Sequence, residues 1–221
     1  MIKNIVWDFD KTLMPMQTER ILMPLVFFDK LSRGHIWWCI SRTPWIIIGL
    51  FLYLINSDYK FIKRCEARFY SGAQLKELIT VAHDLGKRIP QENREKVREA
   101  YKKRYKNYVF SCGSTQPIKE MLRTAGILKY FKSVHANTLT VKNGVITGAK
   151  FEVPNSLGKK QMLKTLGIKA SETLAVGDGE HELMLFETVA KPVVYGHHLR
   201  MVRIAMKNHW PIITSMRELK L

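Results

Sequence analysis

Two aspartates that follow a short apolar segment constrain this 221-residue chain more than any other feature. Asp8 and Asp10 come directly after Ile5-Val6-Trp7, with only Phe9 between them. Side chains alternate in direction along a strand, so both carboxylates would lie on one side of it, and a turn near Phe9 would let both reach one ligand. Ligand sites in open α/β sheets lie beyond the carboxyl ends of the strands. The pair therefore predicts a chemical site, although aspartates are also common in solvated turns.

Three further polar motifs follow in the chain. Ser111 comes after the apolar segment Tyr108-Val109-Phe110, Lys159 opens a predicted helix, and the segment 177–182 (Gly-Asp-Gly-Glu-His-Glu) follows the apolar run 173–176. The set resembles the four motifs of the haloacid dehalogenase-like (HAD) phosphohydrolase superfamily.

The segment 136–148 resembles the part that phosphoserine phosphatases and their subfamily IB relatives carry between the second and third motifs. The resemblance covers residues 1–13 and roughly 105–221, and it leaves out the part between them. It implies a Rossmann-like catalytic core, with a cap inserted after the first strand to cover the active site.

The alternation of short apolar runs and amphipathic stretches after Tyr105 predicts a doubly wound, mostly parallel α/β sheet. We expect strands near 2–7, 107–111, 131–136, 173–177 and 192–195, and helices near 115–126, 158–166, 180–190 and 197–208. Asn143-Gly144 between two β-type runs predicts a small β-hairpin. Residues 1–13 and 105–221 would form this core.

The intervening residues 14–104 lack strand signals and predict a helical cap domain. Their apolar periodicity indicates helices at 17–31, 36–55, 58–70, 73–86 and 91–106, with prolines as breakers or first-turn residues.

Phosphate ester hydrolysis requires positioning, opposing charge and a proton for the leaving oxygen. We assign Asp8 as a nucleophile that forms an aspartyl-phosphate, because a covalent intermediate divides one difficult step into two. Asp10 would act as general acid and base, a role usually worth ~10²–10⁴ in rate. Lys159 would neutralise charge as the pentavalent phosphorus forms, and Lys160 is its only close rival.

Mg²⁺ prefers oxygen ligands, so an acidic site of this kind predicts a magnesium cofactor. The predicted metal ligands are Asp8, the Phe9 carbonyl, Asp10, Asp178 and Glu182, and the role of Phe9 is what the resemblance implies. Phosphate oxygens would bind the Ser111 hydroxyl and the backbone N–H groups of Cys112 and Gly113, together with Lys159.

Two positions depart from the family pattern. Related phosphatases usually have aspartate four residues after the metal-binding Asp178, where this chain has Glu182, and this substitution puts metal affinity in doubt. Phosphoserine phosphatases place an amine-binding glutamate nine residues after the nucleophile, where this chain has Gln17, with Glu19 two residues further on. Specific phosphoserine hydrolysis therefore stays an alternative to the main prediction.

The formal charge of +17, from 36 basic and 19 acidic residues, favours an anionic partner such as a phosphorylated metabolite, an anionic membrane surface or a nucleic acid. The basic run 102–106 with interleaved tyrosines is explained more simply by a solvated helix face, so we expect no specific nucleic-acid binding. Three cysteines without CxxC spacing fit a reducing cytoplasm, and the N-terminus does not resemble a signal peptide. No oligomeric state is predicted.

The segment 45–55 is apolar all round, which is typical of a helix that is buried or in contact with lipid. Extended back to Ile36 it approaches the length of a membrane span, but Arg42 and Pro44 interrupt that longer stretch, so we do not expect it to span a bilayer. It fits a buried cap helix and an interfacial segment equally well, because tryptophans and basic residues flank it.

The main prediction is a Mg²⁺-dependent phosphomonoesterase whose substrate is a small phosphorylated metabolite or a lipid phosphate resembling phosphatidylglycerophosphate. A lipid substrate would place the protein peripherally at the inner membrane face. A different class of protein, a membrane-associated scaffold weakened in catalysis by Glu182, stays open beside it.

Overall fold

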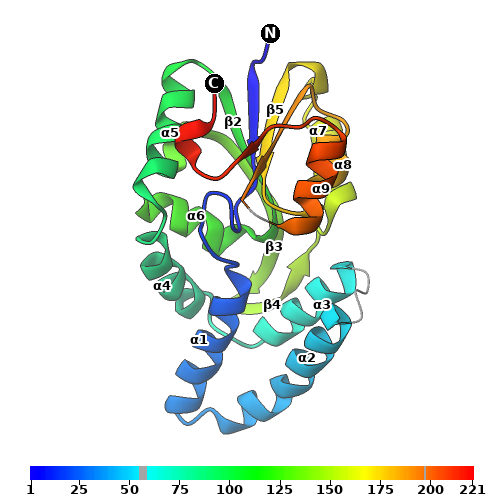
Figure 1. The fold of residues 1–221 in the computed structure, drawn as a ribbon. Helices are drawn as coiled ribbons and strands as arrows, with labels where there is room; N and C mark the ends of the chain where they lie inside the picture. Colours follow the sequence, from blue (N-terminus) through cyan, green and yellow to red (C-terminus); the bar gives the residue numbers. More distant parts are fainter. Residues whose placement is uncertain (55–58, 197) are drawn as a thin grey trace.

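The computed structural model describes residues 1–54, 59–196 and 198–221, and these form a twisted sheet covered by helices on both faces (Figure 1). The strand order is β4-β3-β2-β1-β5-β6-β7, and all neighbours pair in parallel except β3 with β4. The strands are β1 (Asn4–Trp7), β2 (Lys106–Ser114), β3 (Phe131–Lys142), β4 (Val145–Lys150), β5 (Thr173–Gly177), β6 (Lys191–Tyr195) and β7 (Ile212–Ile213). The predicted doubly wound α/β fold is confirmed.

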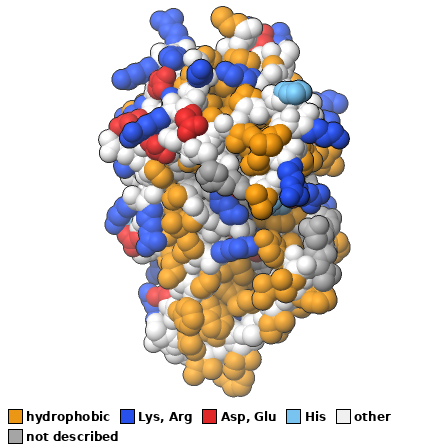
Figure 2. Space-filling view, in the orientation of Figure 1, with side chains coloured by type: hydrophobic (Ala, Val, Ile, Leu, Met, Phe, Trp, Pro, Cys, Tyr) orange, Lys and Arg blue, Asp and Glu red, His pale blue; other side chains and the backbone are white. Residues whose placement is uncertain are grey.

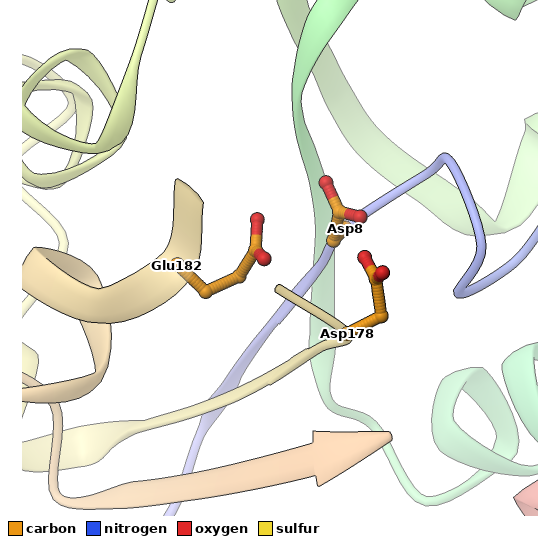
Figure 3. A group of neighbouring side chains, drawn as sticks. All are labelled: Asp8, Asp178 and Glu182. Carbon is orange, nitrogen blue, oxygen red and sulfur yellow. The ribbon is translucent and has the colours of Figure 1, made fainter. Parts of the chain in front are cut away.

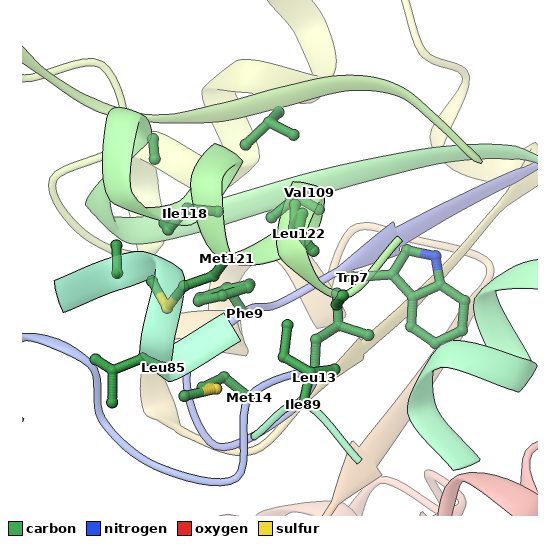
Figure 4. Close-up of a cluster of buried hydrophobic side chains, with 14 of the residues drawn as sticks. Trp7, Phe9, Leu13, Met14, Leu85, Ile89, Val109, Ile118, Met121 and Leu122 are labelled. Carbon is green, nitrogen blue, oxygen red and sulfur yellow. The ribbon is translucent and has the colours of Figure 1, made fainter. Parts of the chain in front are cut away.

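Strand β1 lies at the centre because its four residues are all buried and both of its edges are paired. Ile5 and Trp7 pack into the core on one face of the sheet, and Val6 packs into the core on the other. The Trp7 indole Nε1 donates to Asn107 Oδ1 at 3.1 Å, which satisfies a polar group that would otherwise be buried without a partner. Figure 4 shows Trp7 and Phe9 within the larger core.

Helices α5 (Gln91–Lys102) and α6 (Thr115–Thr124) cover the face of Trp7 with apolar side chains such as Val97 and Met121. Helices α7 (Ser156–Thr165), α8 (Leu183–Phe186) and α9 (Leu199–Lys207) cover the opposite face. The helices that lead to β2 and β3 therefore cover one face, and the helices that lead to β5, β6 and β7 cover the other, as in a doubly wound sheet.

Helices α1 (Glu19–Ser32), α2 (Ile36–Leu54) and α3 (Tyr59–Tyr70) lie beyond the carboxyl edge of the sheet (Figure 1). The β3–β4 hairpin reaches toward them, where Leu75 N donates to Gly144 O and Ile146 N donates to Ala73 O. Helix α4 (Leu75–Gly86) packs against α6, and α5 packs against β2. The division of the chain at residue 104 stays a prediction, because two helices of the predicted cap lie against the core.

Several elements differ in length from the prediction. Strand β3 continues to Lys142, so the hairpin is longer than expected, and the short edge strand β7 was not predicted. The predicted helix 180–190 is a 3₁₀ turn followed by the four-residue α8, because β-branched Thr188 and Val189 disfavour its continuation. The predicted helix ends at residues 55, 58 and 197 lie outside the described residues.

Candidate active site

The carboxyl edge of the sheet holds a cavity of about 340 Å³. Trp7 at the end of β1 lies opposite Val109 of β2 and Val176 of β5, so the residues that follow these three positions meet at one edge. The predicted side chains that line the cavity are Asp8, Asp10, Ser111, Cys112, Lys159, Asp178 and Glu182. The structure thus brings together side chains from four separate parts of the chain.

Lys159 is the buried cation of this cavity, with 1 % of its surface exposed. Its Nζ lies 2.5 Å from Asp8 Oδ1 and also donates to Glu182 Oε1. Burial alone disfavours its charged form, but the two carboxylates raise the pKa of Lys159 well above its usual value. Lys160 points to solvent. Lys159, which the sequence favours over Lys160, is therefore the lysine that contacts Asp8.

Asp8, Asp178 and Glu182 form a cluster whose ligand oxygens all lie within 4.8 Å of one another. Figure 3 shows the three side chains converging. Burial, and then the charge of Glu182, raise the pKa of Asp8 to about 7. Burial, and then the charge of Asp8, raise the pKa of Asp178 to about 8. Lys11 and Lys159 both act to lower the pKa of Asp178, yet it stays raised, so the acids outweigh the nearby cations and the cluster favours a bound cation.

Glu182 fits this cluster because the neighbouring Gly177 has no side chain. A Cβ atom at Gly177 would lie 2.3 Å from Glu182 Cγ and 3.2 Å from Asp8 Cβ. Glu182 Oε2 also accepts a hydrogen bond from Gly179 N at 2.9 Å, so its second oxygen holds the loop that carries Asp178. The longer side chain therefore folds into the space left by the glycine, with both oxygens already engaged.

Asp10 lies beside the cluster with one oxygen held and the other directed into the cavity. Its Oδ1 accepts hydrogen bonds from Thr18 N at 2.8 Å and Thr18 Oγ1 at 2.6 Å, and its Oδ2 faces Gly113. Burial, offset in part by Thr18, raises the pKa of Asp10 to about 6. A carboxyl group with this pKa can give and accept a proton near neutral pH.

The Phe9 carbonyl, a predicted metal ligand, is hydrogen-bonded within the turn after β1. Its oxygen accepts backbone hydrogen bonds from Met14 N at 2.9 Å and Thr12 N at 3.3 Å. Both lone pairs are thereby used to close the turn after β1, and the Phe9 ring is fully buried in the core.

Ser111 lies in β2 at the floor of the cavity and is 1 % exposed. Its Oγ accepts a hydrogen bond from Gly113 N at 3.0 Å, so this N–H faces the serine hydroxyl. The Cys112 side chain also lines the cavity, and burial raises the pKa of its thiol to about 12. The thiol is therefore protonated at neutral pH, and it does not act as a thiolate nucleophile.

Side chains from the helices beyond the sheet, none of them among the predicted site residues, also line the cavity. These lining residues are Tyr53, Tyr59 and Ile62. The Tyr59 ring packs against the His181 ring with centroids 4.1 Å apart, and burial lowers the pKa of His181 to about 4. The only sequence signal was the expectation that a cap covers the site, because the positions that face the core depend on how the helices pack.

Gln17 lines the cavity, whereas Glu19 does not. The buried Glu19 carboxylate accepts hydrogen bonds from Tyr70 OH at 2.7 Å and Ser114 Oγ at 2.9 Å. Glu19 thus has a structural role. The side chain that faces the cavity is the uncharged amide of Gln17.

Comparisons with known proteins agree with this arrangement. The family model described as haloacid dehalogenase-like hydrolase matches residues 5–186. A phosphoserine phosphatase from Campylobacter jejuni subsp. doylei is 29 % identical over 195 residues, which cover 84 % of this chain and 83 % of the relative.

Two solved structures show the same fold. A protein with unknown function from Bordetella pertussis Tohama I has a TM-score of 0.75 at 13 % identity, covering 97 % of this chain and 99 % of its own. A phospho-aspartyl intermediate analogue of phosphoserine phosphatase has a TM-score of 0.66 at 20 % identity, covering 98 % of this chain and 96 % of its own.

Proposed function

Because the chain belongs to the haloacid dehalogenase-like hydrolase family and is a phosphatase of the phosphoserine phosphatase-like kind, we propose that it hydrolyses phosphate monoesters through an aspartyl-phosphate on Asp8. The observation that carries this proposal is the meeting of Asp8, Asp10, Ser111 and Lys159 around one cavity. The predicted family and the predicted class of enzyme are confirmed.

In the first step an Asp8 carboxylate oxygen attacks phosphorus, and the bond between phosphorus and the leaving oxygen breaks. Asp10, whose Oδ1 is fixed by Thr18, gives its proton to that oxygen. In the second step Asp10 takes a proton from water, which attacks phosphorus and releases phosphate and the free Asp8 carboxylate.

Lys159 and Ser111 assist these steps by binding the phosphoryl oxygens. Lys159 supplies positive charge where the trigonal-bipyramidal transition state gathers negative charge, and its contact with Asp8 also holds the nucleophile in place. The Ser111 hydroxyl is free to donate to a phosphoryl oxygen while its own oxygen accepts from Gly113 N.

The acidic cluster fits Mg²⁺, because its donors are all carboxylate oxygens and its acids outnumber the lysine that contacts them. We propose that Asp8 and Asp178 hold the ion, while Glu182 supports it indirectly through Lys159 and the Gly179 N–H group. Bound Mg²⁺ would withdraw charge from the phosphoryl group and lower the pKa values of the surrounding acids.

The test is turnover of a generic aryl phosphate with Mg²⁺ and with excess EDTA. We expect activity only with Mg²⁺, and we expect Asp8→Asn to abolish it. Asp84→Asn is the control, because this carboxylate is 68 % exposed and pairs with Lys87 on the surface. If Asp8→Asn keeps its turnover, or if no phosphate ester is hydrolysed by the wild type, the proposed function is wrong. The absence of any turnover would favour the non-catalytic, membrane-associated scaffold.

For the substrate we propose a phosphorylated metabolite or a lipid phosphate that resembles phosphatidylglycerophosphate, turned over at the cytoplasmic side of a membrane. Phosphoserine is the second candidate, because the Campylobacter relative is a phosphoserine phosphatase. Gln17 weighs against it, since an amide lacks the charge that pairs with an ammonium group. A screen of phosphoamino acids, sugar phosphates, nucleotides and lipid phosphates, with and without vesicles, separates these candidates.

A further inference from the structure

The outward face of α2 carries no charged side chain. Cys39 is the only buried residue of this 19-residue helix. The large apolar side chains exposed on it are Ile36, Trp37, Ile40, Ile47, Ile48, Leu50, Phe51, Tyr53 and Leu54. A helix this exposed would normally alternate apolar and charged residues if water were its only neighbour. Among the described residues, α2 alone is long and apolar enough to cross a bilayer by length and composition.

Helix α1 extends the same apolar surface. Its exposed apolar side chains are Leu25, Phe28 and Leu31, and the chain passes from α1 to α2 at the tip of the molecule farthest from the two termini (Figure 1). Figure 2 shows apolar side chains gathered over this end of the molecule. We name the surface made by the exposed apolar residues of α1 and α2 the cap face. A contiguous apolar surface of this kind on a folded protein indicates a partner.

A row of basic side chains borders the cap face on α3. Lys60, Arg64 and Arg68 are exposed and lie four residues apart, so they follow one line along the helix. The Arg68 guanidinium lies 4.3 Å from the centre of the Trp45 ring, which joins the basic row to α2. Within the described parts of α2 and α3 the only acid is Glu66, and Lys63 binds it at 2.7 Å.

The basic row meets the apolar surface at a hollow of about 570 Å³ between α2, α3 and β4. Trp45, Ile48, Leu52 and Phe61 line it together with Arg64 and Arg68. Apolar walls beside two guanidinium groups suit a molecule that is both apolar and anionic, such as a lipid with a phosphate headgroup.

The cap face also connects to the catalytic cavity. Tyr53, in the last turn of α2, is 47 % exposed and lines the cavity that holds Asp8. The Arg20 guanidinium lies 4.8 Å from the centre of the Tyr53 ring, so a positive charge accompanies it there. A surface that touches α2 would thus lie beside the mouth of the cavity.

We propose that the cap face docks onto an anionic lipid bilayer, with α2 in the plane of the interface, and that this contact presents lipid phosphates to the catalytic cavity. The proposal rests on the proposed phosphomonoesterase function for its substrate class, while the docking itself does not require turnover. Its partner is defined by chemistry: apolar acyl chains against α1 and α2, and negative headgroups against Lys60, Arg64 and Arg68.

Charge favours a bilayer over a second copy of the chain. A symmetric dimer through the cap face would bring two basic rows together on a protein of formal charge +17, whereas an anionic headgroup layer neutralises them. The inner side of α2 packs on α3 and α1, and Arg42 Nε is buried there. Helix α2 is therefore held along the surface of the molecule, which fits an interfacial position.

The experiment is co-sedimentation of the full chain with vesicles of phosphatidylcholine alone and of phosphatidylcholine with ~30 % phosphatidylglycerol. We expect binding to the anionic vesicles and a strong loss of binding in high salt. Replacing Lys60, Arg64 and Arg68 with glutamine should weaken it on the order of 100-fold, since each basic residue near an anionic surface contributes about 1 kcal/mol. Trp37→Glu combined with Phe51→Glu should abolish it.

Two controls separate docking from catalysis and from folding. Met206→Glu on α9 changes an equally exposed apolar residue, 65 % exposed, outside the cap face, and it should bind like the wild type. Asp8→Asn should also bind like the wild type. The Trp37→Glu/Phe51→Glu variant and the variant with glutamine in the basic row, together called the cap-face variants, should keep their turnover of a soluble aryl phosphate. This result would show that they are folded and that the catalytic proposal does not depend on docking.

Three results would overturn the docking proposal: no binding to anionic vesicles, unchanged binding by the cap-face variants, or a wild-type dimer that Trp37→Glu converts to a monomer without any vesicle binding. The last result would identify a second copy of the chain as the occupant of the cap face.

Discussion

Replacing Lys159 tests the electrostatic account of the active site most directly. Lys159 is almost fully buried and contacts both Asp8 and Glu182, which are themselves buried. Lys159→Met keeps most of the side-chain volume and removes the charge, so two carboxylates lose their shared partner. Breaking a buried pair by removing one partner costs about 3–5 kcal/mol. In a chain of this length, about 2–4 °C is lost per kcal/mol, so we expect the Tm to fall by about 10 °C at pH 8.

The loss should shrink as the pH falls. The pKa of Asp8 is already raised to about 7 in the presence of Lys159, whose charge lowers it, so removing Lys159 raises it further. A carboxyl group whose pKa is higher in the folded protein than in the unfolded chain stabilises the fold at low pH and loses this contribution as the pH rises through the folded value. At pH 5 the Asp8 carboxyl group of the variant is protonated and neutral, so the fold no longer has to bury an unpaired negative charge there.

Thermal unfolding in EDTA at pH 5 and pH 8 measures both effects. Lys160→Met is the matched control, because Lys160 is exposed one residue further along the same helix, and surface changes of this kind stay within about 0.5 kcal/mol. Adding Glu182→Gln to Lys159→Met should recover part of the loss at pH 8. Equal effects of the two lysine substitutions, or a loss for Lys159→Met that is the same at both pH values, would refute the reasoning.

Two further predictions concern the same cluster. Gly177→Ala should destabilise the protein by roughly 2 kcal/mol or more and remove activity, because the new Cβ would lie 2.3 Å from Glu182 Cγ. Gly179→Ala is the control and should have a small effect, since the nearest atom to its new Cβ would be 3.7 Å away. Urea unfolding of both variants checks this prediction, and equal unfolding midpoints would contradict it. In EDTA the Tm should fall as the pH is raised from 5 to 8. Burial raises the pKa values of Asp10, Asp8 and Asp178 to about 6, 7 and 8, respectively. The stabilising contribution of these carboxyl groups is lost as the pH rises through their folded-state pKa values. Mg²⁺ should raise the Tm more at pH 8 than at pH 5, and calorimetry that shows equal gains at both pH values would argue against a metal at these acids.

Local sequence chemistry was sufficient for the fold class and for most of the cavity. An acid after a buried strand can be recognised from the apolar run before it, and parallel strands bring their carboxyl ends to one edge wherever they lie in the chain. Asp8, Ser111 and Asp178 could therefore be placed together before any coordinates, and the structure brings them to one cavity.

Other features depended on packing between distant segments. The spacing of Lys159 from Met162 and Leu163 favoured it over Lys160, but only the rotation of α7 decides which lysine is buried and which is exposed. The use of the Phe9 carbonyl in a turn and the fit of Glu182 against Gly177 likewise depend on contacts of a few ångströms.

The sequence by itself determined that residues 45–55 are apolar all round, but this pattern is the same for a helix buried in a core and for one facing lipid. Only the tertiary structure decided that α2 lies on the outside, with a single buried residue, because exposure is set by what the rest of the chain packs against it. The catalytic residues could thus be recognised from acids that follow short apolar strands. The cap face, in contrast, depends on how the helices beyond the sheet pack against one another.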